Sequence, residues 1–259
     1  MSRKYIIGIT SIDRSPEENY LADTLASMDR SGIFRSKIPH EVHIFDSGSP
    51  NLDYIPKDYP VTIHLPMEEE VLKIREIYKD PERNHITLRQ NMVCMASYCA
   101  STDAEFVIML EDDVEFCASF MESIDLWMSR NFKPEKHKMV PIVAFFTPRK
   151  GVMGAFRAGH NIWKYTVAKF YGRQCILVPR EFCDEIAEWF IANFRGRSGG
   201  HDLVLKNWMI HKFPNRPYLY SSVPCFVQHI GKKSSFIDRK KTTLKPVSFS
   251  FQGETWSYI

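Results

Sequence analysis

Three acidic residues directly follow five apolar ones in the segment FVIMLEDDVEF. They are Glu111, Asp112 and Asp113, and the apolar run 106–110 before them is typical of a buried strand. Side chains two residues apart lie on the same side of an extended chain, so we expect Glu111 and Asp113 to point together. Adjacent carboxylates repel one another, and Mg²⁺ or Mn²⁺ relieves this through oxygen ligands and substrate phosphates. The segment predicts a metal–diphosphate site, with a solvated acidic turn as the alternative.

A histidine closes another apolar run, in the segment VPCFVQHIGKKSSF. His229 is followed by Gly231, Lys232, Lys233 and Ser235. A glycine turn that carries lysines and hydroxyls suits phosphate binding. Taken alone, such a histidine is more often a hydrogen-bonded core residue. Together with the acidic segment, it is expected to be a nitrogen ligand for the same cation.

A candidate base lies in the segment RGRSGGHDLVLKNWM. Glycines precede His201 and Asp202, and an apolar helical stretch follows them. Asp202 near a helix N-terminus can serve as a cap. It can also serve as a general base that removes the proton of an acceptor hydroxyl, with the glycines leaving room for a substrate. His201 is the other candidate for that role.

Strands and helices must alternate to position these residues. Apolar runs predict strands at 5–9, 41–45, 61–65, 106–110, 140–146, 174–178 and 222–230. Helical spacing predicts helices at 20–30, 87–100, 182–194 and 201–209. This alternation through the first half of the chain indicates an α/β layered sheet, in which ligands bind beyond the carboxyl ends of the strands.

Composition excludes several classes of protein. The chain has 259 residues, 44% of them hydrophobic and 25% charged, which excludes disorder, collagen and coiled coil as the main description. A net charge of +3 does not by itself indicate nucleic-acid binding, although 232–245 is locally basic. The six cysteines form no C-x-x-C motif and have no zinc-ligand spacing, as expected of reduced thiols. No signal peptide or membrane helix is evident, so we expect a cytoplasmic protein.

Taken together, these segments resemble GT-A glycosyltransferases, most closely the family of the animal N-acetylglucosaminyltransferases IV. The similar segments are IIGITSIDR (6–14), RQNMVCMASYCA (89–100), LEDDV (110–114), GVMG (151–154), HDLVL (201–205) and the pattern P-x-x-x-Q-H-x-G-x-x-S-S from Pro224. The resemblance implies a Rossmann-like mixed sheet flanked by helices, in one catalytic domain over 1–259. That domain would comprise a nucleotide-sugar-binding half (1–115), an acceptor-binding half (116–236) and a C-terminal tail (237–259).

The resemblance also implies an activity and a set of site residues. The activity is metal-dependent, inverting transfer of a hexosyl or pentosyl group from a nucleotide sugar, usually a UDP-sugar, to an acceptor hydroxyl. Asp113 would ligate Mn²⁺ or Mg²⁺, His229 would complete its shell, and Asp202 would be the base. The residues expected near the nucleotide sugar are Thr10, Ser11, Arg14, Asp46, Asn91, Glu111, Asp112, Lys232, Lys233 and Ser235.

The acceptor and two other classes of function stay open. Position 13 is acidic where the animal enzymes tend to be basic, and 155–200 matches poorly. The acceptor is a glycan, a protein-linked or lipid-linked saccharide, or a hydroxylated base of phage-type DNA, which the basic segment 232–245 would suit. A metal-dependent phosphohydrolase or nuclease would use the same carboxylates without an acceptor. A non-catalytic binding module is the third class. The missing anchor and stem favour a microbial or viral enzyme.

Overall fold

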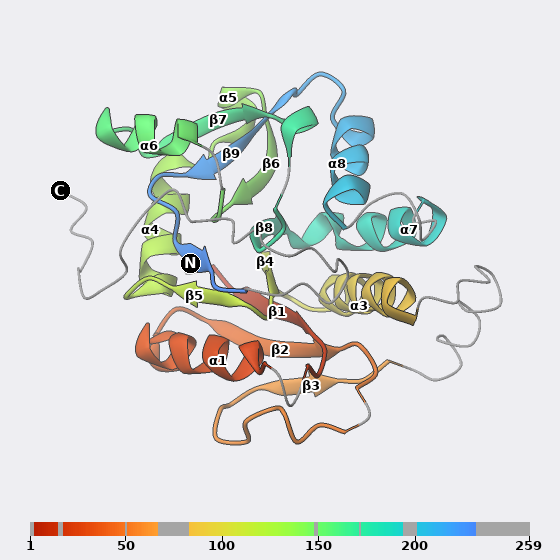
Figure 1. Ribbon diagram of the computed structural model, residues 1–259. Helices are drawn as coiled ribbons and strands as arrows, with labels where there is room; N and C mark the ends of the chain where they lie inside the picture. Colours follow the sequence, from red (N-terminus) through yellow and green to blue (C-terminus); the bar gives the residue numbers. More distant parts are fainter. Residues whose placement is uncertain are drawn as a thin grey trace.

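The computed structural model describes residues 3–14, 18–49, 51–66, 83–147, 150–170, 172–193 and 201–231. A mixed eight-stranded sheet with helices on both faces forms its centre (Figure 1). This architecture confirms the predicted fold class, an α/β mixed sheet flanked by helices. In the described part of the chain, no helix combines the length and the apolar composition that a membrane span requires.

The strands of the large sheet are ordered β3-β2-β1-β4-β8-β6-β9-β7. Their bounds are β1 (Tyr5–Ser11), β2 (His40–Asp46), β3 (Thr62–His64), β4 (Phe106–Glu111), β6 (Met139–Ala144), β7 (Ile162–Thr166), β8 (Cys175–Pro179) and β9 (Tyr218–Ser222). The first four strands of the chain pair in parallel, whereas β8 runs antiparallel to both β4 and β6. In register, Thr10 lies opposite Glu111, and Ser11 lies opposite Asp46. We call the edge where β1, β2 and β4 end the carboxyl edge.

Helices cover the two faces of the sheet. They are α1 (Tyr20–Arg30), α3 (Arg83–Ala100), α4 (Phe120–Asn131), α5 (Pro134–His137), α6 (Lys150–Arg157), α7 (Cys183–Asn193) and α8 (His201–Lys212). Short 3₁₀ turns are η1 (Ile33–Arg35), η2 (Val167–Lys169) and η3 (Arg180–Phe182). In Figure 1, α1 and α4 lie to the left of the sheet, and α3, α7 and α8 lie to the right.

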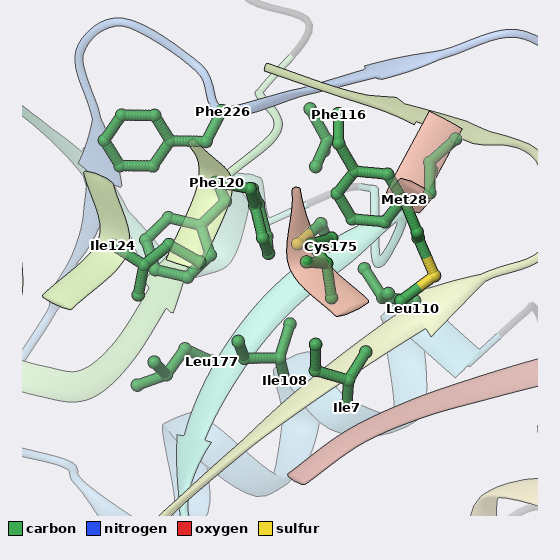
Figure 2. Close-up of a cluster of buried hydrophobic side chains, with 14 of the residues drawn as sticks. Ile7, Met28, Ile108, Leu110, Phe116, Phe120, Ile124, Cys175, Leu177 and Phe226 are labelled. Atoms are coloured by element: carbon green, nitrogen blue, oxygen red, sulfur yellow. The ribbon is translucent and has the colours of Figure 1, made fainter. Parts of the chain in front are cut away.

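The alternation of strand side chains divides the core in two. Ile7 belongs to the cluster of buried side chains that also contains Met28 of α1 and Ile124 of α4 (Figure 2). Its neighbour Ile6 points to the opposite face and joins the cluster that contains Trp208 of α8. Burial on both faces explains why β1 and β4 appear in the sequence as continuous apolar runs rather than as alternating ones.

Several elements differ from the sequence expectation. The prediction of one strand over 222–230 is wrong. Strand β9 ends at Ser222, and after it only Val227–His229 of the expected range forms a strand, β10. Strand β10 pairs with β5 (Val114–Phe116) in a separate two-stranded sheet. The helix expected at 87–100 begins earlier, at Arg83. Strands β7 and β9 were not predicted. Helix α4 was also missed, although its buried residues Phe120, Ile124 and Trp127 follow helical spacing.

Candidate active site

The acidic turn after β4 directs its carboxylates to two sides. Glu111 and Asp113 lie on one side with His229, and one donor atom from each lies within 4.8 Å of the other two. Asp113 Oδ2 is 3.0 Å from His229 Nε2. Among the described residues this is the one group of three such side chains close enough to share a cation. The expected pairing of positions 111 and 113 is therefore present in the structure.

The small β5–β10 sheet brings His229 to the acidic turn. His229 pairs in register with Val114, and the backbone N–H of Ile230 donates to the carbonyl oxygen of Asp113 at 2.8 Å. These two backbone contacts fix the imidazole beside a carboxylate that lies 116 positions earlier in the chain. Backbone pairing thus positions the side chains, and the site depends on the register of β5 against β10.

Gly231 leaves no room for a side chain at this centre. A Cβ atom there would lie 2.1 Å from Asp113 Oδ2 and 3.0 Å from His229 Nε2. We therefore expect Gly231→Ala to push the two side chains apart and to weaken Mn²⁺ binding about 10-fold to 100-fold, measured by calorimetry. The control is Gly154→Ala in α6, where an added Cβ meets nothing within 4 Å. Equal Mn²⁺ affinity in both variants would contradict the expected cation site.

Asp112 points away from the other two carboxylates, toward β1. It is 2% exposed, and its Oδ2 accepts hydrogen bonds from Ser11 Oγ and from Arg14 Nη1, each at 2.8 Å. The Arg14 guanidinium also lies over the ring of Tyr20, 5.4 Å from its centroid. Asp112 therefore joins Ser11 and Arg14, and all three were expected near the nucleotide.

Thr24 of α1 holds the backbone of the acidic turn. Its Oγ1 lies 2.8 Å from the carbonyl oxygen of Asp112 and 3.0 Å from that of Val114, and it accepts from the Val114 N–H at 3.1 Å. The side chain is fully buried. Thr24→Val keeps the shape and removes these bonds, so we expect a loss of about 1–3 kcal/mol in the free energy of unfolding by denaturant titration. The exposed Thr62→Val on β3 is the control, and an equal loss there would exclude this role.

Asp46 and Asn91 bind the loop that follows β2. Asp46 Oδ1 accepts from the backbone N–H of Gly48 at 2.8 Å and from that of Ser49 at 2.7 Å, and its Oδ2 accepts from Tyr54 Oη at 2.5 Å. Asn91 Nδ2 donates to the carbonyl oxygen of Phe45 at the end of β2, at 2.9 Å, and to Ser47 Oγ in the loop. Both side chains lie at the carboxyl edge, and their hydrogen bonds go to the end of β2 and to the segment that follows it.

The pKa shifts indicate an excess of negative charge. Burial raises the pKa of Glu111 to about 7, and the charge of Asp113 adds to this shift. Burial also raises the pKa of Asp112, although the Arg14 guanidinium opposes the shift. Burial lowers the pKa of His229, but the hydrogen bond and the charge of Asp113 outweigh it and leave that pKa raised. Burial is thus the largest cause of the two carboxylate shifts and the Asp113 charge adds to both, whereas the shift of His229 is due to the neighbouring carboxylates.

Asp202 lies in the first turn of α8, as expected. Its Oδ2 accepts from the backbone N–H of Gly172 at 3.0 Å, so it connects the start of α8 to the loop before β8. Burial raises its pKa, which the Gly172 N–H and the charge of Arg173 oppose. The charge of Asp202 also acts on Glu111. The structure therefore brings the candidate base near the acidic turn while giving it a bond that suits a purely structural role.

Sequence reasoning missed Arg173. This residue is fully buried, and its Nη2 donates to Thr10 Oγ1 at 3.0 Å. It immediately precedes Gln174 and β8, which pairs antiparallel with β4 beside Glu111. A lone arginine before a strand carries no signal in the sequence, and only the order of strands in the sheet places it here.

Some of the expected site residues lie outside the described part of the chain. They are Lys232, Lys233 and Ser235, together with the basic segment 232–245 and the tail 237–259.

No protein-family model and no curated protein matches the chain. Many solved structures are similar to it in fold, among them the following two. Mouse xyloside xylosyltransferase 1, in its apo form, has a TM-score of 0.45 and 12% identity, covering 82% of this chain and 83% of that one. The galactosyltransferase LgtC, in complex with donor and acceptor sugar analogues, has a TM-score of 0.45 and 10% identity, covering 80% and 70%. The comparisons give no support to the specific N-acetylglucosaminyltransferase IV resemblance, and likenesses this weak leave the function to be inferred from the residues of the site.

Proposed function

We propose that the protein is a glycosyltransferase that binds a nucleotide sugar through a divalent cation and transfers the sugar to an acceptor hydroxyl. The observation that carries this proposal is the convergence of Glu111, Asp113 and His229 at the carboxyl edge of the sheet. That edge is where ligands of α/β sheets bind. A two-metal hydrolase needs two clusters of metal ligands. The described residues form only one such cluster, which argues against this alternative.

The residues at the centre fit a divalent cation. Asp113 Oδ1 is buried and has no hydrogen-bond partner among the described residues. Carboxylate oxygens with one imidazole nitrogen suit Mn²⁺ and Mg²⁺. The carboxylates whose charges act on Arg173 are those of Glu111, Asp112, Asp113 and Asp202. When all four are ionised and His229 is neutral, as a metal ligand must be, they exceed the two guanidinium groups of Arg14 and Arg173 by two negative charges, which suits a divalent cation.

Each side chain then receives a proposed role. Asp113 and His229 hold the cation, and Glu111 is placed to be a third ligand as well as a contact to the sugar. When bound, the cation neutralises charge on the departing nucleoside diphosphate. Thr10 and Ser11 at the end of β1, together with Arg14 and Asp112, form one wall of the donor site, and Asp46 and Asn91 shape the adjoining loop. Lys232, Lys233 and Ser235 are proposed to add phosphate contacts.

Asp202 is proposed as the general base. Its carboxylate accepts the proton of the acceptor hydroxyl, which attacks the anomeric carbon from the face opposite the diphosphate and inverts its configuration. The raised pKa of Asp202 makes it a stronger proton acceptor than an exposed aspartate. We propose a UDP-sugar as the donor and a saccharide as the acceptor, since the DNA alternative depends on segment 232–245, outside the described residues.

A panel of nucleotide sugars, tested by thermal shift and then by transfer, examines this function. We expect a UDP-sugar to raise the Tm in the presence of Mn²⁺ and to leave it unchanged in EDTA. Release of UDP should then depend on an added saccharide acceptor. Release at the same rate without any acceptor would favour a phosphohydrolase, and cleavage of DNA would favour a nuclease. No response to any nucleotide sugar with Mn²⁺ would contradict the proposal.

A further inference from the structure

Arg173 is a buried charge with few hydrogen bonds. It is 0% exposed, and beyond the bond to Thr10 Oγ1 its Nε and Nη1 have no hydrogen-bond partner among the described residues. A guanidinium removed from water at such cost needs compensation by opposite charge. The charges that act on it are those of Glu111 first and then Asp202, followed by Asp112 and Asp113. Thr10 lies opposite Glu111 in the β1–β4 pair, and Asp202 accepts from the N–H of Gly172 next to Arg173, so the geometry places both the candidate metal centre and the candidate base beside this charge.

The backbone around Arg173 fixes its position between these groups. The N–H of Glu111 donates to the carbonyl oxygen of Gln174 at 3.3 Å, which joins β8 to the acidic turn. The N–H of Gly172 donates to Asp202 Oδ2 at 3.0 Å, which joins the same loop to α8. Arg173 lies between these two attachments in the chain. Its charge is therefore held by neighbours on both sides, unlike the charge of a flexible surface arginine.

We propose that Arg173 is a built-in counter-cation of the metal centre, and thus a positioning residue. Its fixed charge holds the carboxylates of Glu111 and Asp202 together when no divalent cation is bound. The same charge repels an incoming cation, so it lowers the affinity of the centre for free Mn²⁺. This inference rests on the proposed function, because it requires Glu111, Asp113 and His229 to bind a cation.

The test is the affinity of the protein for Mn²⁺ alone, measured by electron paramagnetic resonance at pH 8 without a donor. Arg173→Met keeps most of the side-chain length and removes the charge. We expect it to bind Mn²⁺ about tenfold more tightly, because like charges in a buried site repel more strongly than in water. Arg173→Lys keeps the charge and should bind Mn²⁺ with nearly the wild-type affinity. Damage to the site would have the opposite effect, because misplaced ligands weaken binding.

A second measurement, the Tm with and without Mn²⁺, keeps the test decisive if Arg173→Met does not fold without metal. We expect Mn²⁺ to raise the Tm of Arg173→Met by more than it raises the Tm of the wild-type protein. Unchanged or weaker Mn²⁺ binding by folded Arg173→Met would overturn the inference. So would failure of both Arg173→Met and Arg173→Gln to fold in saturating Mn²⁺, because the cation is expected to replace the guanidinium charge. Absence of Mn²⁺ binding to the wild-type protein would instead refute the proposed cation site itself.

Discussion

Replacing Asp113 with asparagine is expected to lower sugar transfer by about a thousandfold and to remove Mn²⁺-dependent donor binding. Asparagine keeps the shape of the side chain but removes the negative charge that is proposed to hold the cation. Loss of one electrostatic contact to the transition state costs about 10²–10³ in rate in well-studied enzymes. Asp113 is buried, and its Oδ2 lies 3.0 Å from His229 Nε2, so the change removes the carboxylate that is paired with the proposed nitrogen ligand.

Donor binding is measured by calorimetry with and without Mn²⁺, and transfer by release of nucleoside diphosphate. Asp58→Asn makes the same chemical change at an exposed position and should leave both quantities unchanged. His229→Gln should reproduce the loss of Mn²⁺ affinity, because it removes the nitrogen ligand of the same centre. Wild-type Mn²⁺ affinity in the Asp113 variant would remove this residue from the metal centre.

Replacing Asp202 with asparagine is expected to lower transfer at least about a hundredfold while the KM for the donor stays near its wild-type value in saturating Mn²⁺. A positioned general base contributes about 10²–10⁴-fold to the rate. In the wild-type protein the N–H of Gly172 donates to Asp202 Oδ2 at 3.0 Å. The amide oxygen of asparagine can accept the same hydrogen bond, so the loop before β8 should keep its position. The loss should therefore appear in kcat.

The structural alternative for Asp202 makes a different prediction. A residue that only fastens the start of α8 would change stability by about 0.5–2 kcal/mol and leave kcat unaltered. Asp184→Asn, at an exposed acid in the first turn of α7, is the matched control for a helix-terminal charge. A lower Tm with wild-type kcat in Asp202→Asn would assign this side chain to the fold rather than to the reaction.

Part of the fold was predictable because burial leaves a local pattern. Helix α1 has the predicted bounds, and the apolar run before Glu111 corresponds to β4. The shared side of Glu111 and Asp113 followed from the two-residue repeat of extended chain. These features depend on neighbours in sequence, so the sequence alone specifies them.

The rest of the site depends on pairings that no local pattern encodes. Arg173 acts at the centre only because β8 pairs antiparallel with β4. Thr24 holds the acidic turn because α1 packs beside β5, and nothing in the sequence around it marks that contact. His229 was predicted from its own segment, but the strand that positions it is shorter than expected and pairs with β5 outside the large sheet.

Anomalous diffraction at the manganese absorption edge, from crystals soaked with MnCl₂ and UDP, tests the central claim most directly. The account predicts one strong peak in contact with a carboxylate oxygen of Asp113 and with Nε2 of His229, with Glu111 beside it. The diphosphate of UDP should reach the same peak from the carboxyl edge of the sheet. A peak elsewhere, or a diphosphate bound with no manganese between it and Asp113, would contradict the account.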